Sequence, residues 1–277
     1  MRPDAAALKP PVPYYGGKQR LAERIMALLA GVPHKHYVEP FCGSLAVLMA
    51  KPVARMETVN DLDGELMTFW RVLRDRPADL ERVIACTPHS RAEYTAAFEP
   101  AVDELETARR VWVRLTQSRT GTLRKTGWRH HQDPNGSSVG MPGYLEAYRQ
   151  RLPAAVARLQ GVSLEARPAL EVIAAYGRHD EVLLYGDPPY LGSTRARNYR
   201  HEMGAEADHR NLALALGDCR AAVMVSGYDS ELYRDLYEGW HRYELTSGTS
   251  QGGAWSDRTE LVWSNRDLAR QPTLFDR

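Results

Sequence analysis

The segment with the clearest chemical content is Asp187-Pro188-Pro189-Tyr190, which follows the apolar run 182–185 after a single glycine. Two successive prolines fix the backbone and remove two N–H donors, so nearby carbonyl groups stay available as hydrogen-bond acceptors. The Asp187 carboxylate can accept from the same partner, and the Tyr190 ring can stack on a flat base. The alternative is an ordinary turn at the end of a strand, since Asp-Pro is common in turns. We predict a site that recognises an exocyclic amino group on a planar ring.

A second segment, Glu39-Pro40-Phe41-Cys42-Gly43, lies between a predicted strand and a predicted helix. Open α/β sheets bind ligands at the carboxyl ends of strands, where small residues let the backbone approach the ligand. Asp61 follows the next predicted strand, and an acid at that place can accept from both hydroxyls of a ribose. A tight turn and a helix N-cap at Asp61 are the alternatives. Taken as a pair, the two features favour nucleoside binding.

The third segment is Tyr14-Tyr15-Gly16-Gly17-Lys18, close to the N-terminus. Paired glycines before a lysine can mark a site for an anionic group. They can equally form a flexible lead into the helix that we expect to begin near Gln19. By itself the segment favours neither interpretation.

Alternating strands and helices must position these segments. The predicted strands lie at 36–39, 55–60, 162–166, 182–185, 221–225, 240–245 and 260–263, with helices at 44–50, 62–74, 169–176 and 208–216. This alternation is typical of an α/β domain with a largely parallel sheet that is covered on both faces. Residues 70–155 break the rhythm and predict helices plus a long loop at 120–142. The expected architecture is one α/β domain, formed by 1–69 and 156–277, with a mostly helical insertion at 70–155.

The predicted insertion carries a basic stretch, because residues 107–132 include no acid. Its basic and tryptophan side chains are Arg109, Trp112, Arg110, Arg114, Arg119, Arg124, Lys125, Trp128 and Arg129. Basic residues interleaved with aromatic ones are typical of a surface that contacts a phosphate backbone. A solvated basic helix and loop is the alternative.

Length and composition limit the class of protein. The 277 residues can bury one core and leave room for an insertion, while a net charge of +1 does not discriminate between partners. No apolar run reaches the length of a membrane-spanning helix, and the first residues lack the order of a signal peptide. Three widely spaced cysteines match no metal-ligand spacing. We therefore expect no metal site, and free thiols in a reducing cytoplasm.

In their order along the chain, the three segments closely resemble the Dam-like adenine-N6 DNA methyltransferases, particularly those of phages and prophages. The resemblance runs from residue 14 to about residue 265 and implies a Rossmann-like, S-adenosylmethionine-dependent methyltransferase sheet with an inserted target recognition domain. It implies that the residues holding the cofactor are Tyr14, Lys18, Glu39, Pro40, Phe41, Gly43, Asp61 and Asp187. It implies that the target adenine is held by Asp187, Pro188, Pro189 and Tyr190. The insertion is then expected to contact double-stranded DNA, with candidate contacts at Arg119, Arg124, Lys125, Trp128 and Arg129.

The implied reaction is site-specific transfer of a methyl group from S-adenosylmethionine to adenine N6 in DNA, after the base has been flipped out of the duplex. Methylation of cytosine N4 or of an RNA adenine are alternatives, as is a DNA-binding relative with weak catalysis. Two positions depart from the family pattern. Leu45 stands where many relatives have a second glycine or an alanine, and Pro168 stands where relatives often carry an Asp that reads the cofactor adenine. These departures imply either lower cofactor affinity or a substitute contact.

Two further segments give narrower expectations. Ser226-Gly227-Tyr228 ends a predicted core strand and either lines the floor of the site or forms a plain turn. Gln271 to Phe275 resembles the peptides that bacterial replication proteins dock into the sliding clamp, with a disordered tail as the alternative. A DNA-modifying enzyme of this kind is expected in the cytoplasm, associated with the nucleoid.

Overall fold

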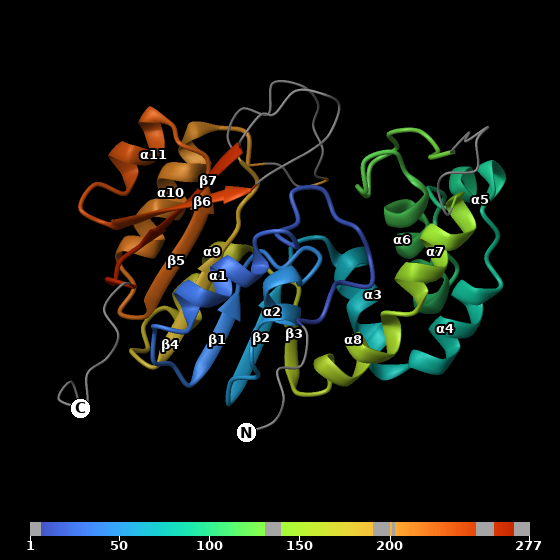
Figure 1. Ribbon diagram of the computed structural model, residues 1–277, viewed down its shortest axis with the longest axis horizontal. Coiled ribbons are helices and arrows are strands. Elements are labelled where there is room, and N and C mark those ends of the chain that lie inside the picture. Colours follow the sequence, from blue (N-terminus) through green and yellow to red (C-terminus); the bar gives the residue numbers. More distant parts are fainter. Residues whose placement is uncertain (1–6, 131–139, 191–199, 201–202, 248–257, 269–277) are drawn as a thin grey trace.

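The centre of the computed structural model, which describes residues 7–130, 140–190, 200, 203–247 and 258–268, is a seven-stranded sheet. Its strand order is β3-β2-β1-β4-β5-β7-β6, with β1 to β5 parallel and β7 antiparallel to both of its neighbours (Figure 1). The strands are β1 (His36–Glu39), β2 (Met56–Asn60), β3 (Val162–Glu165), β4 (Val182–Gly186), β5 (Ala222–Gly227), β6 (His241–Ser247) and β7 (Arg258–Ser264). The predicted strands are confirmed, and their ends move by no more than two residues. The largely parallel α/β class is confirmed as well.

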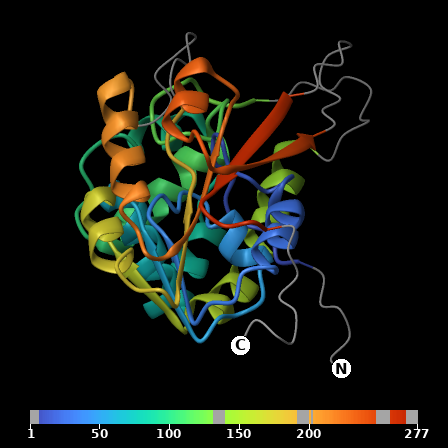
Figure 2. The same ribbon diagram turned by 90° about the vertical axis from the view of Figure 1, so that its left-hand side faces the viewer.

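Helices cover both faces of the sheet, and a further group lies beyond the β3 edge (Figures 1 and 2). Those at the sheet are α1 (Ala22–Leu29), α2 (Ala46–Ala50), α9 (Ala169–Tyr176), α10 (Glu206–Gly217) and α11 (Glu231–Leu236). The further group consists of α3 (Gly64–Asp75), α4 (Pro77–Ala85), α5 (Arg91–Ala96), α6 (Glu104–Gln117), α7 (Gly140–Arg149) and α8 (Leu152–Leu159). We call α3 to α8 and their connections the helical region. The prediction that residues 70–155 are mostly helical is confirmed.

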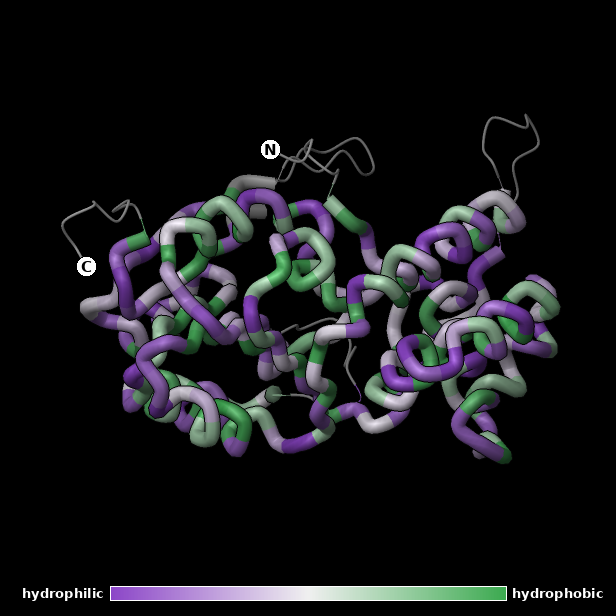
Figure 3. Tube along the Cα trace, turned by 90° about the horizontal axis from the view of Figure 1, so that it is seen from below, coloured by the Kyte–Doolittle hydropathy of each residue, from purple (hydrophilic) through white to green (hydrophobic). Residues whose placement is uncertain are grey.

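Alternate residues of the strands supply two buried clusters, one on each face of the sheet. In β4, Leu183 and Tyr185 pack in the cluster that includes α1 and α2, whereas Val182 and Leu184 pack with α9 and α10. Figure 3 shows hydrophobic and hydrophilic residues alternating along the helices, as expected for helices with one buried and one exposed face. None of the helices in the described ranges combines the length and the apolar character that a bilayer span requires.

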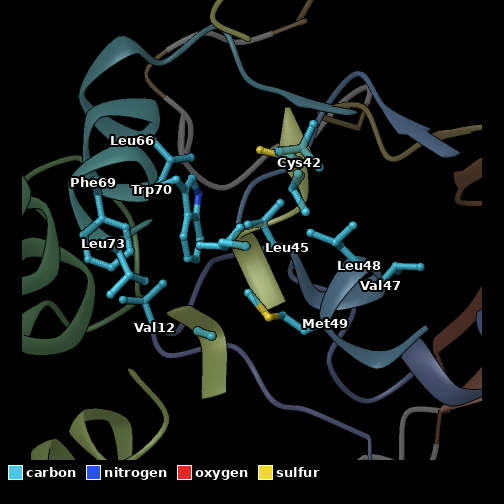
Figure 4. Packing of buried hydrophobic residues seen from close by; sticks show 14 of the residues in the cluster. Val12, Cys42, Leu45, Val47, Leu48, Met49, Leu66, Phe69, Trp70 and Leu73 are labelled. Atoms are coloured by element: carbon cyan, nitrogen blue, oxygen red, sulfur yellow. The ribbon is translucent and has the colours of Figure 1, made fainter. Parts of the chain in front are cut away.

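The helical region shares its core with the sheet. The cluster around α1 and α2 continues into α3, and Figure 4 shows Leu45 between Trp70 and Leu48. The expected boundaries at 69/70 and 155/156 fall inside α3 and α8. The division of the chain into a catalytic and a target recognition domain stays a prediction.

Candidate active site

The first two site segments meet where the order of the strands reverses. Strands β1 and β4 are parallel neighbours, with Tyr37 opposite Leu183. The chain leaves β1 towards β2 and β3 and later returns to β4, so the loops that follow β1 and β4 diverge. Such a switch point is the place where open α/β sheets bind ligands. Glu39 ends β1 and Asp187 directly follows β4, so both segments lie at this point.

A cavity of 290 Å³ lies at the switch point. Its wall includes every residue that was expected to hold a cofactor, namely Tyr14, Lys18, Glu39, Pro40, Phe41, Gly43, Asp61 and Asp187. Pro189 also lines the cavity, whereas Pro188 and Tyr190 are outside its wall. The structure therefore brings the three segments together around one space, although they are far apart in the sequence.

The loop after β1 has a backbone shape that depends on Gly43. Its φ is +45°, and a β-carbon added there would lie 3.0 Å from Cε1 of Tyr14. The Gly43 N–H donates to Oδ2 of Asp61 at 3.1 Å, and the Trp70 indole N–H donates to the Gly43 carbonyl at 3.1 Å. Gly43 thus couples the N-terminal segment, the acid after β2 and the helical region.

Leu45 occupies a left-handed backbone conformation, with φ 59° and ψ 29°. This conformation costs a non-glycine residue about 1–2 kcal/mol, which accounts for the small residue that the resemblance places there. The Leu45 side chain is fully buried between α2 and α3, and burial of a leucine contributes roughly 1.5–3 kcal/mol in the opposite direction. The loop therefore keeps the shape that a glycine would give it.

Asn60 holds the ends of three strands together, although nothing in the sequence singled it out. It is fully buried, and its side-chain amide donates to the carbonyls of Pro40 at 2.9 Å and Arg167 at 3.0 Å. Its Oδ1 accepts from the Arg167 N–H at 2.9 Å. Pro168, which follows, lines the cavity and carries no side-chain acceptor. Its place at the last position of the predicted strand 55–60, directly before Asp61, was the available signal.

Two acids of the cavity differ in how they are held. Both oxygens of Asp61 accept backbone N–H groups, from Asp63 at 3.0 Å and from Gly43 at 3.1 Å. Glu39 is 3% exposed and accepts from the Tyr37 hydroxyl at 2.7 Å. Burial raises the pKa of Glu39 to about 7, and the hydrogen bond from Tyr37 offsets only part of this effect.

Lys18 joins the N-terminal segment to the motif after β4. Its Nζ lies 2.7 Å from Oδ1 of Asp187 and 3.3 Å from Oε1 of Glu260, and it donates to the Gly16 carbonyl at 3.1 Å. Burial lowers the pKa of Lys18, but the carboxylates of Asp187 and Glu260 outweigh it and leave this pKa above its usual value. Lys18 is therefore an ammonium group at neutral pH.

Glu260 is a site residue that the sequence had indicated only as part of a strand. Strand β7 pairs with β5 and places this carboxylate beside the motif, where it accepts from the Tyr190 hydroxyl. The same hydroxyl lies 3.0 Å from Oδ1 of Asp187. Burial raises the pKa of Glu260, although Lys18 acts against this. An acid at the start of the apolar run 261–263 was the only sequence signal.

The Tyr190 ring lies between a cation and a second aromatic ring. Lys18 Nζ is 4.8 Å from its centroid, and the Tyr228 ring is 4.5 Å away at an angle of 59°. Burial raises the pKa of Tyr190 well above its usual value, so its hydroxyl stays neutral and can donate. Ser226, at the end of β5, bonds the Tyr185 hydroxyl at 2.8 Å. The segment 226–228 therefore lies beside the Asp187–Tyr190 motif.

Four of the five candidate DNA contacts lie on a short hairpin, residues 118–128, and the fifth, Arg129, directly follows it. Its base is closed by a bridge between Ser118 and Trp128, and the Arg119 N–H donates to the Gly127 carbonyl at 3.0 Å. The Tyr15 N–H donates to the Gly121 carbonyl at 2.8 Å, which places the hairpin beside the N-terminal segment of the cavity.

The basic residues divide into two groups. Arg109 and Arg110 pair with Glu106 at 2.7 and 2.6 Å, and Arg114 pairs with Glu65 at 2.7 Å. These three arginines of α6 are therefore engaged within the protein. No carboxylate among the described residues pairs with Arg119, Lys125 or Arg129. Since these three side chains of the basic stretch have no carboxylate partner in the part of the chain that the structure describes, they are better suited to contact phosphates than the arginines of α6.

An aromatic stack stands at the base of the hairpin. The Trp128 ring is stacked on His89 at 4.5 Å and on His130 at 5.6 Å, and the Arg91 guanidinium lies 4.8 Å from its centroid. His89 and Arg91 come from the start of α5 and had not been identified from the sequence. The contacts of Trp128 therefore connect the hairpin to the residues at the start of α5.

Gln271 to Phe275 lies outside the described residues. Among the residues that the structure describes, no group of three or more His, Cys, Asp or Glu side chains is placed to hold a metal ion.

Comparison with known proteins gives a family match over most of the chain. Residues 14–250 match the model of the D12 class N6 adenine-specific DNA methyltransferases. The Type II methyltransferase M1.LlaDCHI of Lactococcus lactis subsp. cremoris is 25% identical over 278 aligned positions, which cover 93% of this chain and 95% of that protein.

Among solved structures, the methyltransferase yhhF of Escherichia coli is 13% identical, with a TM-score of 0.40 and coverage of 96% and 98% of the two chains. The rRNA methyltransferase aviRa of Streptomyces viridochromogenes is 15% identical, with a TM-score of 0.37 and coverage of 95% and 87%.

Proposed function

The chain belongs to the family of D12 class N6 adenine-specific DNA methyltransferases, and on this premise we propose that the cavity binds S-adenosylmethionine and that Asp187 to Tyr190 hold the target adenine. The enzyme is thus an adenine-specific DNA methyltransferase, and its substrate is DNA. The observation that supports the site assignment is the convergence of the three segments on one cavity at the switch point.

The wall of the cavity fits S-adenosylmethionine, which combines an adenosine with a positive charge. Asp61, fixed by two backbone N–H groups, is suited to the ribose hydroxyls. The Glu39 carboxylate is suited to the cationic portion. Leu62 and Leu170 line the wall but are 47% and 42% exposed, so a flat purine that covers them would remove apolar surface from water. Leu170 follows Pro168, so an apolar contact stands near the place where relatives carry an acid.

When bound, S-adenosylmethionine supplies an electrophilic methyl group on a positively charged sulfur. Oδ1 of Asp187 is already engaged by Lys18 and the Tyr190 hydroxyl, which leaves Oδ2 to accept from adenine N6. Together with the Pro188 carbonyl, this oxygen would draw the N6 lone pair out of conjugation with the ring. The rate then arises from positioning and from fixed charges rather than from a strong base. After transfer, the acidic N6 proton has Asp187 as its nearest acceptor.

An adenine inside a duplex does not reach this site, so the base must be flipped out of the stack. Tyr190 and Tyr228, the latter 40% exposed, are the rings placed to replace the lost stacking. Stacking on an aromatic side chain contributes about 1–3 kcal/mol per base. We propose that Arg119, Arg124, Lys125 and Arg129 contact phosphates and that the Trp128 stack supports this surface.

Two proposals concern biological context. The name of the Lactococcus relative, Type II methyltransferase, supports a role in restriction and modification. The three cysteines are free, which is consistent with a reducing compartment, and we propose that the enzyme acts in the cytoplasm at the nucleoid.

The chemical test is to incubate the purified chain with methyl-labelled S-adenosylmethionine and DNA, digest the DNA to nucleosides and identify the labelled one by mass spectrometry. Label in N6-methyldeoxyadenosine is expected. Label in N4-methylcytosine, or label in RNA but not in DNA, would contradict the assigned target.

We also propose that Gln271 to Phe275 docks into a bacterial sliding clamp through Leu274 and Phe275. A pull-down with purified clamp should recover the wild-type chain but not a Leu274→Ala/Phe275→Ala variant. Equal recovery of both would remove the proposal.

A further inference from the structure

A buried acid that lies outside the cavity wall contacts both groups that hold Asp187. Glu260 lies 3.3 Å from Lys18 Nζ and accepts from the Tyr190 hydroxyl, and its side chain is 8% exposed. It belongs to β7, the antiparallel strand that follows residues 248–257 in the chain. Burial of a carboxylate costs free energy. Glu260 is nevertheless buried beside Lys18 and Tyr190, although it is distant from both in the sequence.

The contacts of Asp187 explain what Glu260 can do there. Lys18 at 2.7 Å and the Tyr190 hydroxyl at 3.0 Å converge on the same oxygen of Asp187, Oδ1. Both groups also contact one oxygen of Glu260, Oε1. The ammonium therefore donates to two carboxylates, and the hydroxyl shares its single hydrogen between the same two. Without Glu260, Lys18 would keep its contacts with Asp187 and the Gly16 carbonyl, the Tyr190 hydroxyl would keep only Asp187, and both groups would gain freedom to move.

This orientation matters because the chemistry at N6 depends on the direction of a lone pair. An amino group presented about 1 Å from its productive position can lose on the order of 100-fold in rate. The oxygen of Asp187 that accepts from N6 is placed by what holds the other oxygen. A residue that holds Lys18 and Tyr190 in place therefore also fixes the orientation of the reacting amine.

We propose that Glu260 is a positioning residue for methyl transfer, which holds Lys18 and the Tyr190 hydroxyl against Oδ1 of Asp187 so that Oδ2 meets the target amine. This inference rests on the proposed function of Asp187. It assigns a task in the reaction to a residue outside the cavity wall and outside the Asp-Pro-Pro-Tyr motif.

A purely structural role is the competing explanation, and the chain offers a matched control for it. Glu57, at the start of β2, is an equally buried glutamate that contacts two cations, Lys51 at 2.7 Å and Arg158 at 2.8 Å. It is absent from the wall of the cavity. Glu57→Gln should therefore report the loss of a buried ion pair alone.

The experiment compares wild type, Glu260→Gln, Glu260→Asp and Glu57→Gln. Single-turnover methylation is measured at saturating S-adenosylmethionine and DNA, alongside the Kd for each and the Tm. For Glu260→Gln we expect a loss of about 10- to 100-fold in single-turnover rate with both Kd values within a few-fold of wild type. Glu260→Asp should recover part of the rate. Glu57→Gln should lower the Tm and leave the rate at saturation unchanged.

The pH dependence of the single-turnover rate gives a second measurement, which a loss of stability alone would not change. Asp187, Glu260 and Tyr190 face Lys18 directly, with Tyr185 and Glu39 behind them. Removal of the Glu260 charge lowers the pKa of Lys18, because burial then acts against a single carboxylate. The rate of Glu260→Gln should therefore fall with rising pH at a lower pH than that of wild type, measured up to about pH 10.

The outcomes separate the two hypotheses. If the wild-type chain methylates adenine but Glu260→Gln reacts within two-fold of the wild-type rate, the positioning role is overturned. An unshifted pH profile of Glu260→Gln would overturn it as well. Neither result would contradict the proposed function. Absence of methylation by the wild-type chain would instead contradict the proposed function.

Discussion

The Nζ atom of Lys18 lies 2.7 Å from Oδ1 of Asp187, which connects the N-terminal segment to the motif that follows β4. The resemblance to known methyltransferases implied that Lys18 helps to hold the cofactor. In the structure, Lys18 lines the cavity while its charge is directed to Asp187 and Glu260. If Asp187 holds the target amine as proposed, this geometry predicts for Lys18 a part in methyl transfer that can be separated from cofactor binding.

Substitution of Lys18 by methionine should therefore lower the single-turnover rate more than the affinity for S-adenosylmethionine. Two buried carboxylates lose their cation, so we expect a rate loss of about 100-fold and a stability loss of about 3–5 kcal/mol. Rapid-quench kinetics at a temperature well below the Tm, with calorimetric titration of the cofactor, measure the two effects. A large rise in Kd at an unchanged rate would show that Lys18 acts through the cofactor instead.

The raised pKa of Glu39 predicts that cofactor binding depends on pH. With a pKa of about 7, Glu39 is largely protonated below neutrality, and a cationic ligand favours its ionised form. The Kd for S-adenosylmethionine should rise as the pH falls from 8 to 6, and binding at neutral pH should release protons. Titration calorimetry in buffers of different ionisation enthalpy detects the release. Glu39→Gln should bind more weakly, with a Kd that no longer changes over this range.

The same carboxyl group affects stability in the absence of ligand, with a definite sign. Because the folded-state pKa exceeds the ordinary value of 4.5, the folded state holds the proton longer than the unfolded chain. Stability is therefore highest below pH 4.5 as far as Glu39 alone is concerned, and it declines through pH 7 by on the order of 3 kcal/mol. Glu39→Gln should flatten this part of the pH dependence of unfolding in urea.

The left-handed conformation of Leu45 predicts that the glycine variant at this position is more stable than the alanine variant, the reverse of the order within a helix. Both Leu45→Ala and Leu45→Gly lose the buried side chain, at about 2–5 kcal/mol. Alanine keeps the strain that glycine relieves, so Leu45→Gly should be more stable than Leu45→Ala by roughly 1 kcal/mol. Leu48 is an equally buried residue within α2 and serves as the control. There the alanine variant should be more stable than the glycine variant by about 1 kcal/mol. The same order at both positions would mean that φ at Leu45 carries no strain.

The two groups of basic residues should respond differently in DNA binding. Arg119→Ala and Lys125→Ala each remove a charge that has no acidic partner among the described residues. Each should therefore weaken DNA binding. Each should also reduce the slope of log K against log salt concentration by about one counterion. Arg109 is engaged with Glu106 and Glu93, and Arg109→Ala should lower the Tm while leaving the salt slope unchanged. Fluorescence anisotropy over a range of salt concentrations compares them. Equal slopes for all three variants would argue against the hairpin as a DNA contact.

The sheet and the site segments were predictable because their signals are local. Apolar runs such as 182–185 predict buried strands, and strand-to-loop transitions at Glu39 and Asp187 mark the carboxyl edge of the sheet. The helix predicted at 62–74 does end nearby, since α3 ends at Asp75, and Pro77 begins α4 because a proline fits the first turn of a helix.

The contacts that tune the site were not predictable, because they join residues that only the fold brings together. Glu260 resembles any acid beside an apolar run until β7 is placed against β5. Asn60 resembles a turn residue until its amide is seen to join Pro40 and Arg167. The basic stretch likewise predicted a charged surface. Glu106 engages Arg109 and Arg110 from within α6, but the partners Glu93 of α5 and Glu65 of α3 depend on how the helices pack.

The most direct measurement compares Asp187→Ala with Asp180→Ala, since the two acids lie at opposite ends of β4 and Asp180 is exposed. Each variant is given labelled S-adenosylmethionine and DNA, the nucleosides are separated by mass spectrometry, and DNA retention is measured in parallel. We predict N6-methyldeoxyadenosine at the wild-type level for Asp180→Ala, no product for Asp187→Ala, and similar DNA retention by both. Sustained formation of N6-methyldeoxyadenosine by Asp187→Ala would contradict the assignment of the active site.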